Sequence, residues 1–211
     1  MSEHVWTIVV AAGRGSRFGG PKQFEMLGTR RIVDWSLDVA TAVSEGVVVV
    51  VPDDAKAEVA GVATVTGGST RSDSVRCGLA AVAADATIVC VHDAARPFAD
   101  ANLYEAVIAA VRAGADGAVP GIAVADTIKQ VDEHGVVVGT PDRQGLVAVQ
   151  TPQAFRADVL RRAHASGGQG TDDASLVEAL GGRVVVVPGA EENRKITHPV
   201  DLAWARRLVA S

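Results

Sequence analysis

The chain has 211 residues, of which 48% are hydrophobic and 21% are charged. These proportions are typical of a globular protein and exclude a collagen-like, coiled-coil or largely disordered chain. The net charge of -5, from 20 Lys and Arg against 25 Asp and Glu, argues against a general nucleic-acid coat and against a protein that binds anionic membranes.

The first half of the chain alternates short Val- and Ile-rich runs with helix-length segments rich in Ala, Leu and Val. Several of the runs are apolar on both faces, as parallel strands covered by helices on both sides are. Alternating strands and helices predict a doubly wound, mostly parallel α/β sheet of Rossmann-like type with right-handed crossovers. The predicted strands are Val5–Val10, Val47–Val51, Val62–Thr66 and Thr87–Val91, and the predicted helices are Arg31–Val43, Ser72–Ala84 and Ala101–Ala113.

The pattern changes between Gly117 and Gln150, where strand-like runs follow one another with no helix between them. The tetrad at 132–135 is made of turn-forming residues, which predicts a β-hairpin around it. We expect residues 121–148 to form a small β-arm that leaves the main sheet. Exposed strand edges tend to pair with another chain, so a second copy of this chain is the expected partner. The runs are Ala118–Val124, Thr127–Val131 and Val136–Thr140.

After this segment the α/β pattern resumes, with Pro199 well placed in the first turn of the last helix. No repeat, linker or low-complexity segment interrupts the chain, so residues 1–211 are expected to form a single domain with the arm projecting from it. The elements predicted here are the helices Arg156–Ala165, Thr171–Leu180 and Pro199–Val209 and the strand Val184–Val187.

From the N-terminal residues, the apolar runs and the cysteines we expect a cytoplasmic protein. The N-terminus lacks the basic start, apolar stretch and cleavage site of a signal peptide, and no apolar run approaches the ~20 residues that span a membrane. Cys77 and Cys90 have neither the number nor the spacing of a disulfide framework or a zinc site. We expect them to be free thiols.

Residues 11–22, which follow the first strand, combine four glycines with three cations. Glycines allow positive φ and let a ligand approach backbone N–H groups, and the carboxyl end of the first strand is where doubly wound sheets bind ligands. The spacing matches neither the G-x-G-x-x-G dinucleotide fingerprint nor a Walker loop. Cations on such a loop suit a triphosphate, whose charge must be neutralised before an anion attacks it. They are Arg14, Arg17 and Lys22.

The run A-A-G-R-G-S-R followed by P-K-Q resembles the signature of sugar- and polyol-phosphate nucleotidyltransferases. The short gap between Arg17 and Pro21 is similar to one family in particular, the 2-C-methyl-D-erythritol 4-phosphate cytidylyltransferases of the non-mevalonate isoprenoid pathway. Further blocks match that family in order over nearly the whole chain: G-G-S-T-R-S-D-S-V, H-D-A-A-R-P, D-T-I-K with T-P-Q-A-F, and N-R-K-I-T. The resemblance implies transfer of CMP from CTP to the polyol phosphate with release of pyrophosphate, Mg²⁺ as cofactor, and a homodimer joined through the β-arm.

The resemblance also implies a nucleotide site. The block at 67–75 corresponds to a loop in which backbone at Gly68 and the hydroxyl of Ser74 match the polar groups of cytosine. Thr70 stands where the family often has Glu, and from the residues alone Ser72 or Asp73 is expected to cap the following helix. The implied nucleotide-binding residues are Ala11, Ala12, Gly13, Gly15, Gly68, Ser74, Ala94 and Lys195.

Asp93 follows a buried strand, where one carboxylate oxygen can hold a hydrated Mg²⁺ while phosphate oxygens supply other ligands. A strand-end Asp that caps a turn is the alternative, and the resemblance favours the metal. The same resemblance gives Arg96 a place on the substrate side. We expect His92 to be structural, because an attacking phosphate already carries its negative charge and needs no general base.

The arm adds residues whose roles come from the resemblance alone. It implies that Asp126, Thr127, Arg143 and Thr151, together with Arg96, hold the polyol phosphate, and that the arm of the other subunit donates the arginine. Catalysis is then expected from positioning and from cations directed at the α-phosphate and the leaving pyrophosphate, for which we select Arg17 and Lys22.

Three other functions fit parts of the pattern. A ribitol 5-phosphate cytidylyltransferase shares the fold and most of the motifs. A sugar-1-phosphate nucleotidyltransferase that uses UTP or dTTP is disfavoured by the short chain and by the loop at 67–74. A non-catalytic nucleotide-binding protein is disfavoured because Arg17, Lys22 and Asp93 are all present.

Overall fold

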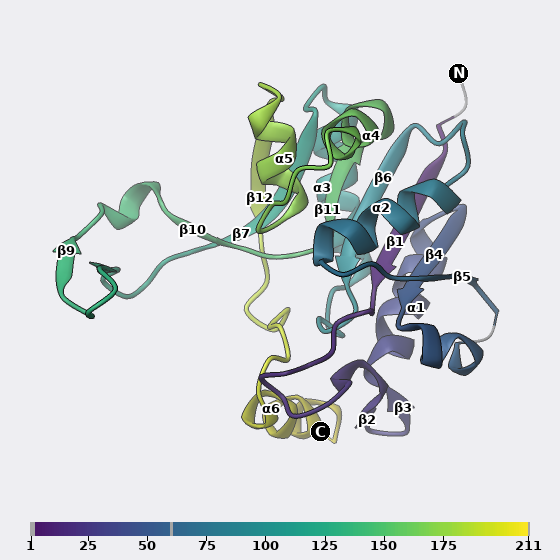
Figure 1. Ribbon diagram of the computed structural model, residues 1–211, viewed down its shortest axis with the longest axis horizontal. Coiled ribbons are helices and arrows are strands. Elements are labelled where there is room, and N and C mark those ends of the chain that lie inside the picture. The colour runs from purple at the N-terminus through teal and green to yellow at the C-terminus, as the bar shows by residue number, and fades with distance from the viewer. Residues whose placement is uncertain (1–2, 60, 211) are drawn as a thin grey trace.

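The computed structural model describes residues 3–59 and 61–210. Within them, eight strands form one mixed sheet in the order β10-β7-β11-β6-β1-β4-β5, and β12 also pairs with β7. Figure 1 shows this sheet as the centre of the main body, with a long arm leaving it at β7 and β10. The strands are β1 (Val5–Val10), β4 (Gly46–Val51), β5 (Ala63–Thr66), β6 (Ile88–Asp93), β7 (Gly117–Ala123), β10 (Val147–Val149), β11 (Gln153–Arg156) and β12 (Val184–Pro188).

The half of the sheet that carries the N-terminal strands is parallel, which confirms the doubly wound α/β prediction. β1 lies between β4 and β6 and runs parallel to both, and β5 continues the parallel order beside β4. Every residue of β6 is buried. The carboxyl ends of β1 and β6 are in register, with Val10 opposite Asp93, so the segments that follow these strands begin side by side.

The half of the sheet that carries β11 and β7 includes antiparallel pairs, whereas the sequence predicted mostly parallel strands. β11 lies between β6 and β7 and runs antiparallel to both. The sequence did not predict this strand, because its four residues show no polar alternation and continue directly into a helix. Arg156, expected to start that helix, still pairs with Ile88 of β6.

Helices cover both faces of the sheet. On one face, α1 (Ile32–Val43) and α3 (Ala101–Arg112) pack in one apolar cluster, and on the other α2 (Arg71–Ala81), α4 (Ala157–Ala165) and α5 (Asp173–Ala179) pack in a second. The predicted helices are confirmed with shifts of a few residues at their ends. None of the helices in the described ranges is long and apolar enough to cross a membrane.

A third apolar cluster joins the two ends of the chain. The short hairpin β2 (Met26–Leu27) and β3 (Arg30–Arg31) packs with the last helix, α6 (Pro199–Val209), around Leu27 and Ile196. Because Phe18 packs against this cluster as well, it fixes the first glycine-rich loop relative to the segment that carries Lys195.

The cap of α2 differs from the prediction. Thr70, not Ser72 or Asp73, is the N-cap, and its hydroxyl accepts from the backbone N–H of Asp73 at 3.0 Å. Asp73 sits at the third helical position and accepts in return from the N–H of Thr70, which completes a capping box. The helix therefore starts at Arg71 and places that side chain in its first turn.

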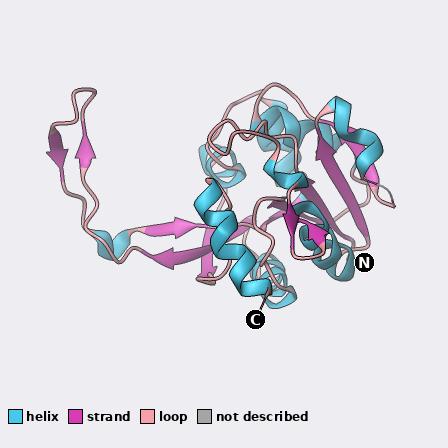
Figure 2. Cartoon of the chain, turned by 90° about the horizontal axis from the view of Figure 1, so that it is seen from below, coloured by secondary structure: helices cyan, strands magenta, loops and turns pink. Residues whose placement is uncertain are grey.

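The segment between β7 and β10 extends away from the body, and Figure 2 shows it from below as a long projection that ends in a hairpin. The hairpin pairs β8 (Gln130–Val131) with β9 (Val137–Gly139), as the turn-forming tetrad predicted. The side chain of Asp132 accepts from two backbone N–H groups in that turn. Exposed valines cover much of the projection, so apolar surface lies open along it.

Candidate active site

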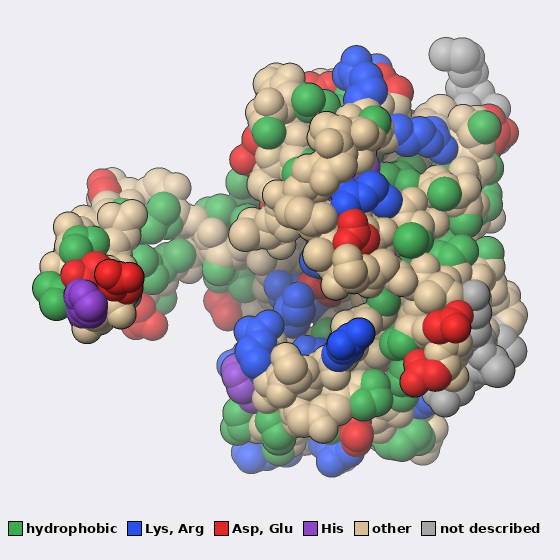
Figure 3. Space-filling model, viewed as in Figure 1, with side chains coloured by type: hydrophobic (Ala, Val, Ile, Leu, Met, Phe, Trp, Pro, Cys, Tyr) green, Lys and Arg blue, Asp and Glu red, His purple; other side chains and the backbone are tan. Residues whose placement is uncertain are grey.

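A cavity of about 370 Å³ lies at the carboxyl ends of β1 and β6 and against the first turn of α2. Figure 3 shows Lys and Arg side chains on both sides of a hollow in the middle of this face. Most of the residues expected from the sequence line it: Arg17, Lys22, Ala11, Ala12, Gly13, Gly15, Gly68, Ser74, Ala94, Lys195 and Asp93. Segments that are far apart along the chain thus meet in one place.

The first loop is held in shape by its own backbone and by one buried amide. Gly15 has a φ of +63°, and a Cβ there would lie 1.8 Å from the carbonyl oxygen of Gly20, so only glycine fits. The amide nitrogen of Gln23 donates to the carbonyl oxygens of Ala11 and Gly13, at 2.7 and 3.2 Å. Gln23 is buried, and nothing in the local sequence pattern indicates its role in shaping this loop.

The loop at 67–74 packs directly on the first loop. A Cβ on Gly67 would lie 2.3 Å from the Cβ of Ala12, which shows how closely the two approach. The hydroxyl of Ser74 accepts from the N–H of Gly68 at 3.2 Å and donates to the carbonyl oxygen of Thr70 at 2.9 Å. These bonds fix the loop in a single shape beside the cavity.

Positive charge is concentrated in the cavity. Burial lowers the pKa of Lys22, and the nearby charges of Lys195 and Arg17 lower it further. A bound polyanion would relieve the repulsion that Lys22 experiences from these two cations, so the charge of the cavity favours an anionic ligand.

Asp93 is the acidic group of this cavity, and its side chain is only 11% exposed. Its Oδ2 lies 2.5 Å from Nζ of Lys195 and its Oδ1 lies 3.3 Å from Nε of Arg71. Burial opposes ionisation, but these two cations outweigh it and hold the pKa of Asp93 well below its usual range. The carboxylate is therefore ionised at neutral pH.

The donor set around Asp93 fits Mg²⁺ bound together with a substrate. No cluster of three or more His, Cys, Asp or Glu able to hold a metal occurs among the described residues. A lone carboxylate in a cationic cavity matches a hard cation that takes most of its ligands from phosphate oxygens and water.

His92 lies beneath the cavity and not on it. Its ring is fully buried, with Nε2 3.2 Å from the carbonyl oxygen of Arg96 and Nδ1 3.1 Å from the hydroxyl of Thr151. Burial lowers the pKa of His92 to about 4, so the ring is neutral at physiological pH. These contacts agree with the structural role expected for it.

Two of the residues expected at the polyol phosphate are outside the cavity lining. The buried hydroxyl of Thr151 accepts from the N–H of Asp93 at 3.0 Å. Arg96 donates from Nη1 to the carbonyl oxygen of Asn193 at 2.7 Å, which ties the segment before Lys195 to the end of β6. In this chain, both side chains support the residues that do line the cavity.

The other three, Asp126, Thr127 and Arg143, lie exposed on the projecting segment and do not line the cavity of their own chain. Arg143 donates to the carbonyl oxygen of Ala125. The structure thus separates these residues from the cluster around Asp93.

A doubly wound sheet, a glycine-rich cationic loop after its first strand and one carboxylate on the neighbouring strand end are together the features of an α/β nucleotidyltransferase. Comparison with known proteins narrows this class. A family model described as 2-C-methyl-D-erythritol 4-phosphate cytidylyltransferase matches residues 5–211, and the chain belongs to this family.

Individual relatives agree with this assignment. The chain is similar to the 2-C-methyl-D-erythritol 4-phosphate cytidylyltransferases of Frankia casuarinae, at 49% identity over 99% of this chain and 82% of that protein, and of Rhodococcus opacus, at 46% identity over 97% and 95%. Among solved structures it is similar to the enzyme of the same name from Thermus thermophilus, with a TM-score of 0.84 and 34% identity over 97% of this chain and 98% of the other.

Proposed function

We propose that this cytidylyltransferase transfers the cytidylyl group of CTP to 2-C-methyl-D-erythritol 4-phosphate and releases pyrophosphate, with the cavity at β1 and β6 as its active site. The observation that carries this proposal is the gathering of Arg17, Lys22 and Lys195 around a cavity with a single ionised carboxylate. Such a cavity neutralises a triphosphate and leaves one anionic position for a metal ion.

The proposed reaction depends on cations that stabilise phosphate charge, and it requires no general base. A phosphate oxygen of the acceptor attacks the α-phosphorus of CTP, a new P–O bond forms, and the bond to the β-phosphate breaks with its electron pair leaving on pyrophosphate. No proton has to be removed from the nucleophile. Arg17 and Lys22 lower the barrier by binding the charge that develops on the α-phosphate and the leaving group.

The remaining lining residues bind and orient the nucleotide. Backbone N–H groups of Gly13 and Gly15 face the phosphates, and the loop at Gly68 and Ser74 meets the base. When the nucleotide enters, the ammonium group of Lys195, which pairs with Asp93 in the free protein, binds the triphosphate as well. Asp93 would hold a magnesium ion, which would supply further charge neutralisation at the triphosphate.

The acceptor phosphate is bound with the help of a second copy of the chain. Asp126, Thr127 and Arg143 are exposed on the projecting segment, which also carries exposed valines, and they do not line the cavity of their own chain. In a homodimer the projection of one subunit brings them to the cavity of the other, and Thr151 and Arg96 support that end of the site.

A release assay tests the substrate assignment. Purified enzyme is given CTP, UTP or dTTP with either 2-C-methyl-D-erythritol 4-phosphate or ribitol 5-phosphate, and pyrophosphate is measured. We expect release with CTP and the methylerythritol phosphate only. Equal or faster pyrophosphate release with ribitol 5-phosphate would show that ribitol 5-phosphate is the acceptor. If CTP, UTP or dTTP binds but no combination of nucleotide and polyol phosphate releases pyrophosphate, the proposed transfer reaction is contradicted.

A further inference from the structure

Arg71 lines the cavity and has no part in the chemistry described above. It is the first residue of α2, and its guanidinium reaches two carboxylates. Nε donates to Oδ1 of Asp93 at 3.3 Å, and Nη1 donates to Oδ2 of Asp173 at 2.8 Å. One arginine therefore connects the carboxylate inside the cavity with another that does not line it.

Asp173 is a fully buried carboxylate at the start of α5, with 0% of its side chain exposed. Its Oδ1 lies 3.0 Å from Nε2 of His164 on α4. Within the described part of the chain, Nδ1 of His164 is buried and has no hydrogen-bond partner. Nε2 is therefore the ring nitrogen that donates to Asp173 and fixes that carboxylate in place.

This arrangement has consequences for both the position and the charge of Asp93. A guanidinium is planar, so two carboxylates bound to two of its nitrogens define its plane and the direction of each N–H. Asp173 also shares the positive charge of Arg71. Arg71 therefore neutralises the charge of Asp93 only in part, and Asp93 keeps negative charge for a cation in the cavity.

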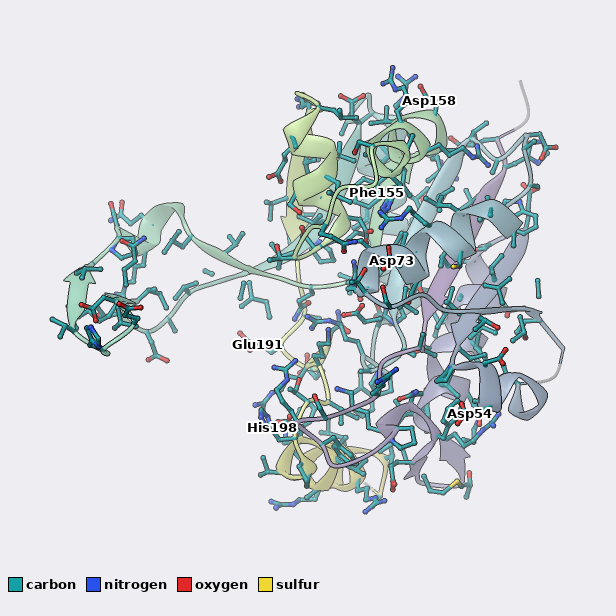
Figure 4. All side chains as sticks on the ribbon, viewed as in Figure 1. Asp54, Asp73, Phe155, Asp158, Glu191 and His198 are labelled. Atoms are coloured by element: carbon teal, nitrogen blue, oxygen red, sulfur yellow. The ribbon has the colours of Figure 1, made fainter. Side chains whose placement is uncertain are left out.

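We propose that Arg71 is a positioning residue for Asp93, and that Asp173 and His164 form the support that fixes Arg71. How well the cavity binds a divalent cation together with the nucleotide then depends on a series of four side chains: His164, Asp173, Arg71 and Asp93. This inference rests on the proposed function, because it takes Asp93 as the metal ligand. The support comes from three helices, and Figure 4 marks the first turns of two of them with Asp73 on α2 and Asp158 on α4.

Binding of CTP to the full chain, measured by calorimetry without an acceptor, tests the proposal. Each protein is titrated once with Mg²⁺ and once with EDTA, and the ratio of the two affinities reports the contribution of the metal. We expect Arg71→Lys and Asp173→Asn to lower this ratio roughly tenfold or more, as the loss of an outer partner of a metal ligand does. The affinity in EDTA should stay close to that of the wild type.

Two further variants make the readout specific. His164→Leu should lower the ratio, and His164→Gln should restore much of it, because a glutamine amide can donate to Asp173 from nearly the same place. Arg112→Lys is the matched control. Arg112 also joins two carboxylates, Glu3 and Glu105, but it does not line the cavity, so the ratio should not change.

Several results would overturn the inference. If Arg71→Lys weakens binding equally in Mg²⁺ and in EDTA, Arg71 binds the triphosphate itself. If Asp173→Asn, which keeps the shape of the side chain, leaves the ratio unchanged and lowers only the melting temperature, the series is structural. A wild-type ratio near one would reject Asp93 as the metal ligand, and with it this inference, whereas a high wild-type ratio with unchanged variants rejects the inference alone.

Discussion

Replacing Lys22 by methionine should reduce turnover without reducing the stability of the protein. The ammonium of Lys22 shares the cavity with Lys195 and Arg17, and burial together with their charges lowers its pKa. Its charge therefore opposes folding at neutral pH, and this opposition fades only as the pH rises toward the ordinary value of 10.5. Methionine keeps most of the side-chain volume and removes the charge.

The effects on turnover and on stability should differ in sign, because the charge that opposes folding is the one proposed to assist the reaction. If Lys22 acts on the developing charge as an oxyanion-hole donor does, its loss removes about 2.7–4 kcal/mol of transition-state stabilisation, which corresponds to a fall of about 10²–10³ in kcat. Removing a repelled charge should leave the free energy of unfolding at pH 7 equal to or above that of the wild type.

Steady-state kinetics with saturating CTP and urea unfolding of the same preparation provide the two numbers. Arg156→Met is the matched control, because Arg156 is exposed, lies outside the cavity and pairs only with Asp158 among the described residues. It should change neither quantity appreciably. A folded Lys22→Met enzyme with nearly normal kcat, or one that is clearly less stable, would refute the reasoning.

The remaining predictions concern the loop, the buried histidine and the dimer. Gln23→Leu leaves the carbonyl oxygens of two loop residues without their donor, so KM for CTP should rise about tenfold or more, and an unchanged KM would show that the loop holds its shape without Gln23. Because the pKa of His92 is lowered to about 4, the folded protein binds fewer protons than the unfolded chain between pH 6.5 and 4. The free energy of unfolding should therefore fall by about 3 kcal/mol as the pH decreases through this range, and in His92→Gln that slope should flatten; parallel wild-type and variant curves would contradict the burial of a neutral ring. Mixing Arg143→Ala with Lys22→Met subunits should restore part of the activity, since one cavity of the mixed dimer then has both groups intact, and inactive mixtures with proven heterodimers would reject donation by the arm.

Much of the fold follows from local pattern. The apolar runs that became β1, β4 and β6 are long enough and apolar enough to specify buried parallel strands, and the helices between them were predicted to within a few residues. The last helix was predicted with both ends correct, because Pro199 marks its first turn. The strand β11 was missed, because its place between β6 and β7 is decided by pairing with residues far away in the chain.

Some residues of the candidate site can likewise be predicted from local sequence, whereas others become apparent only in the folded chain. Glycines and cations close together in sequence, as in residues 11–22, predict a phosphate-binding loop, and the place of Asp93 at a strand end marks it as a candidate metal ligand. Gln23, Asp173 and His164 carry no such signal, since what makes them important is a partner on another element. Arg71 lay inside a recognised block, but its pairing with two carboxylates is a property of the folded chain only.

The central claim is that one cationic cavity brings together two anions, and a crystal structure of the enzyme with Mg²⁺ and a non-hydrolysable CTP analogue tests it most directly. We expect the triphosphate between the first loop and Lys195, the side chains of Arg17 and Lys22 on phosphate oxygens, and the metal ion on Asp93. A nucleotide bound elsewhere, or a triphosphate that touches neither of those two cations, would contradict the claim.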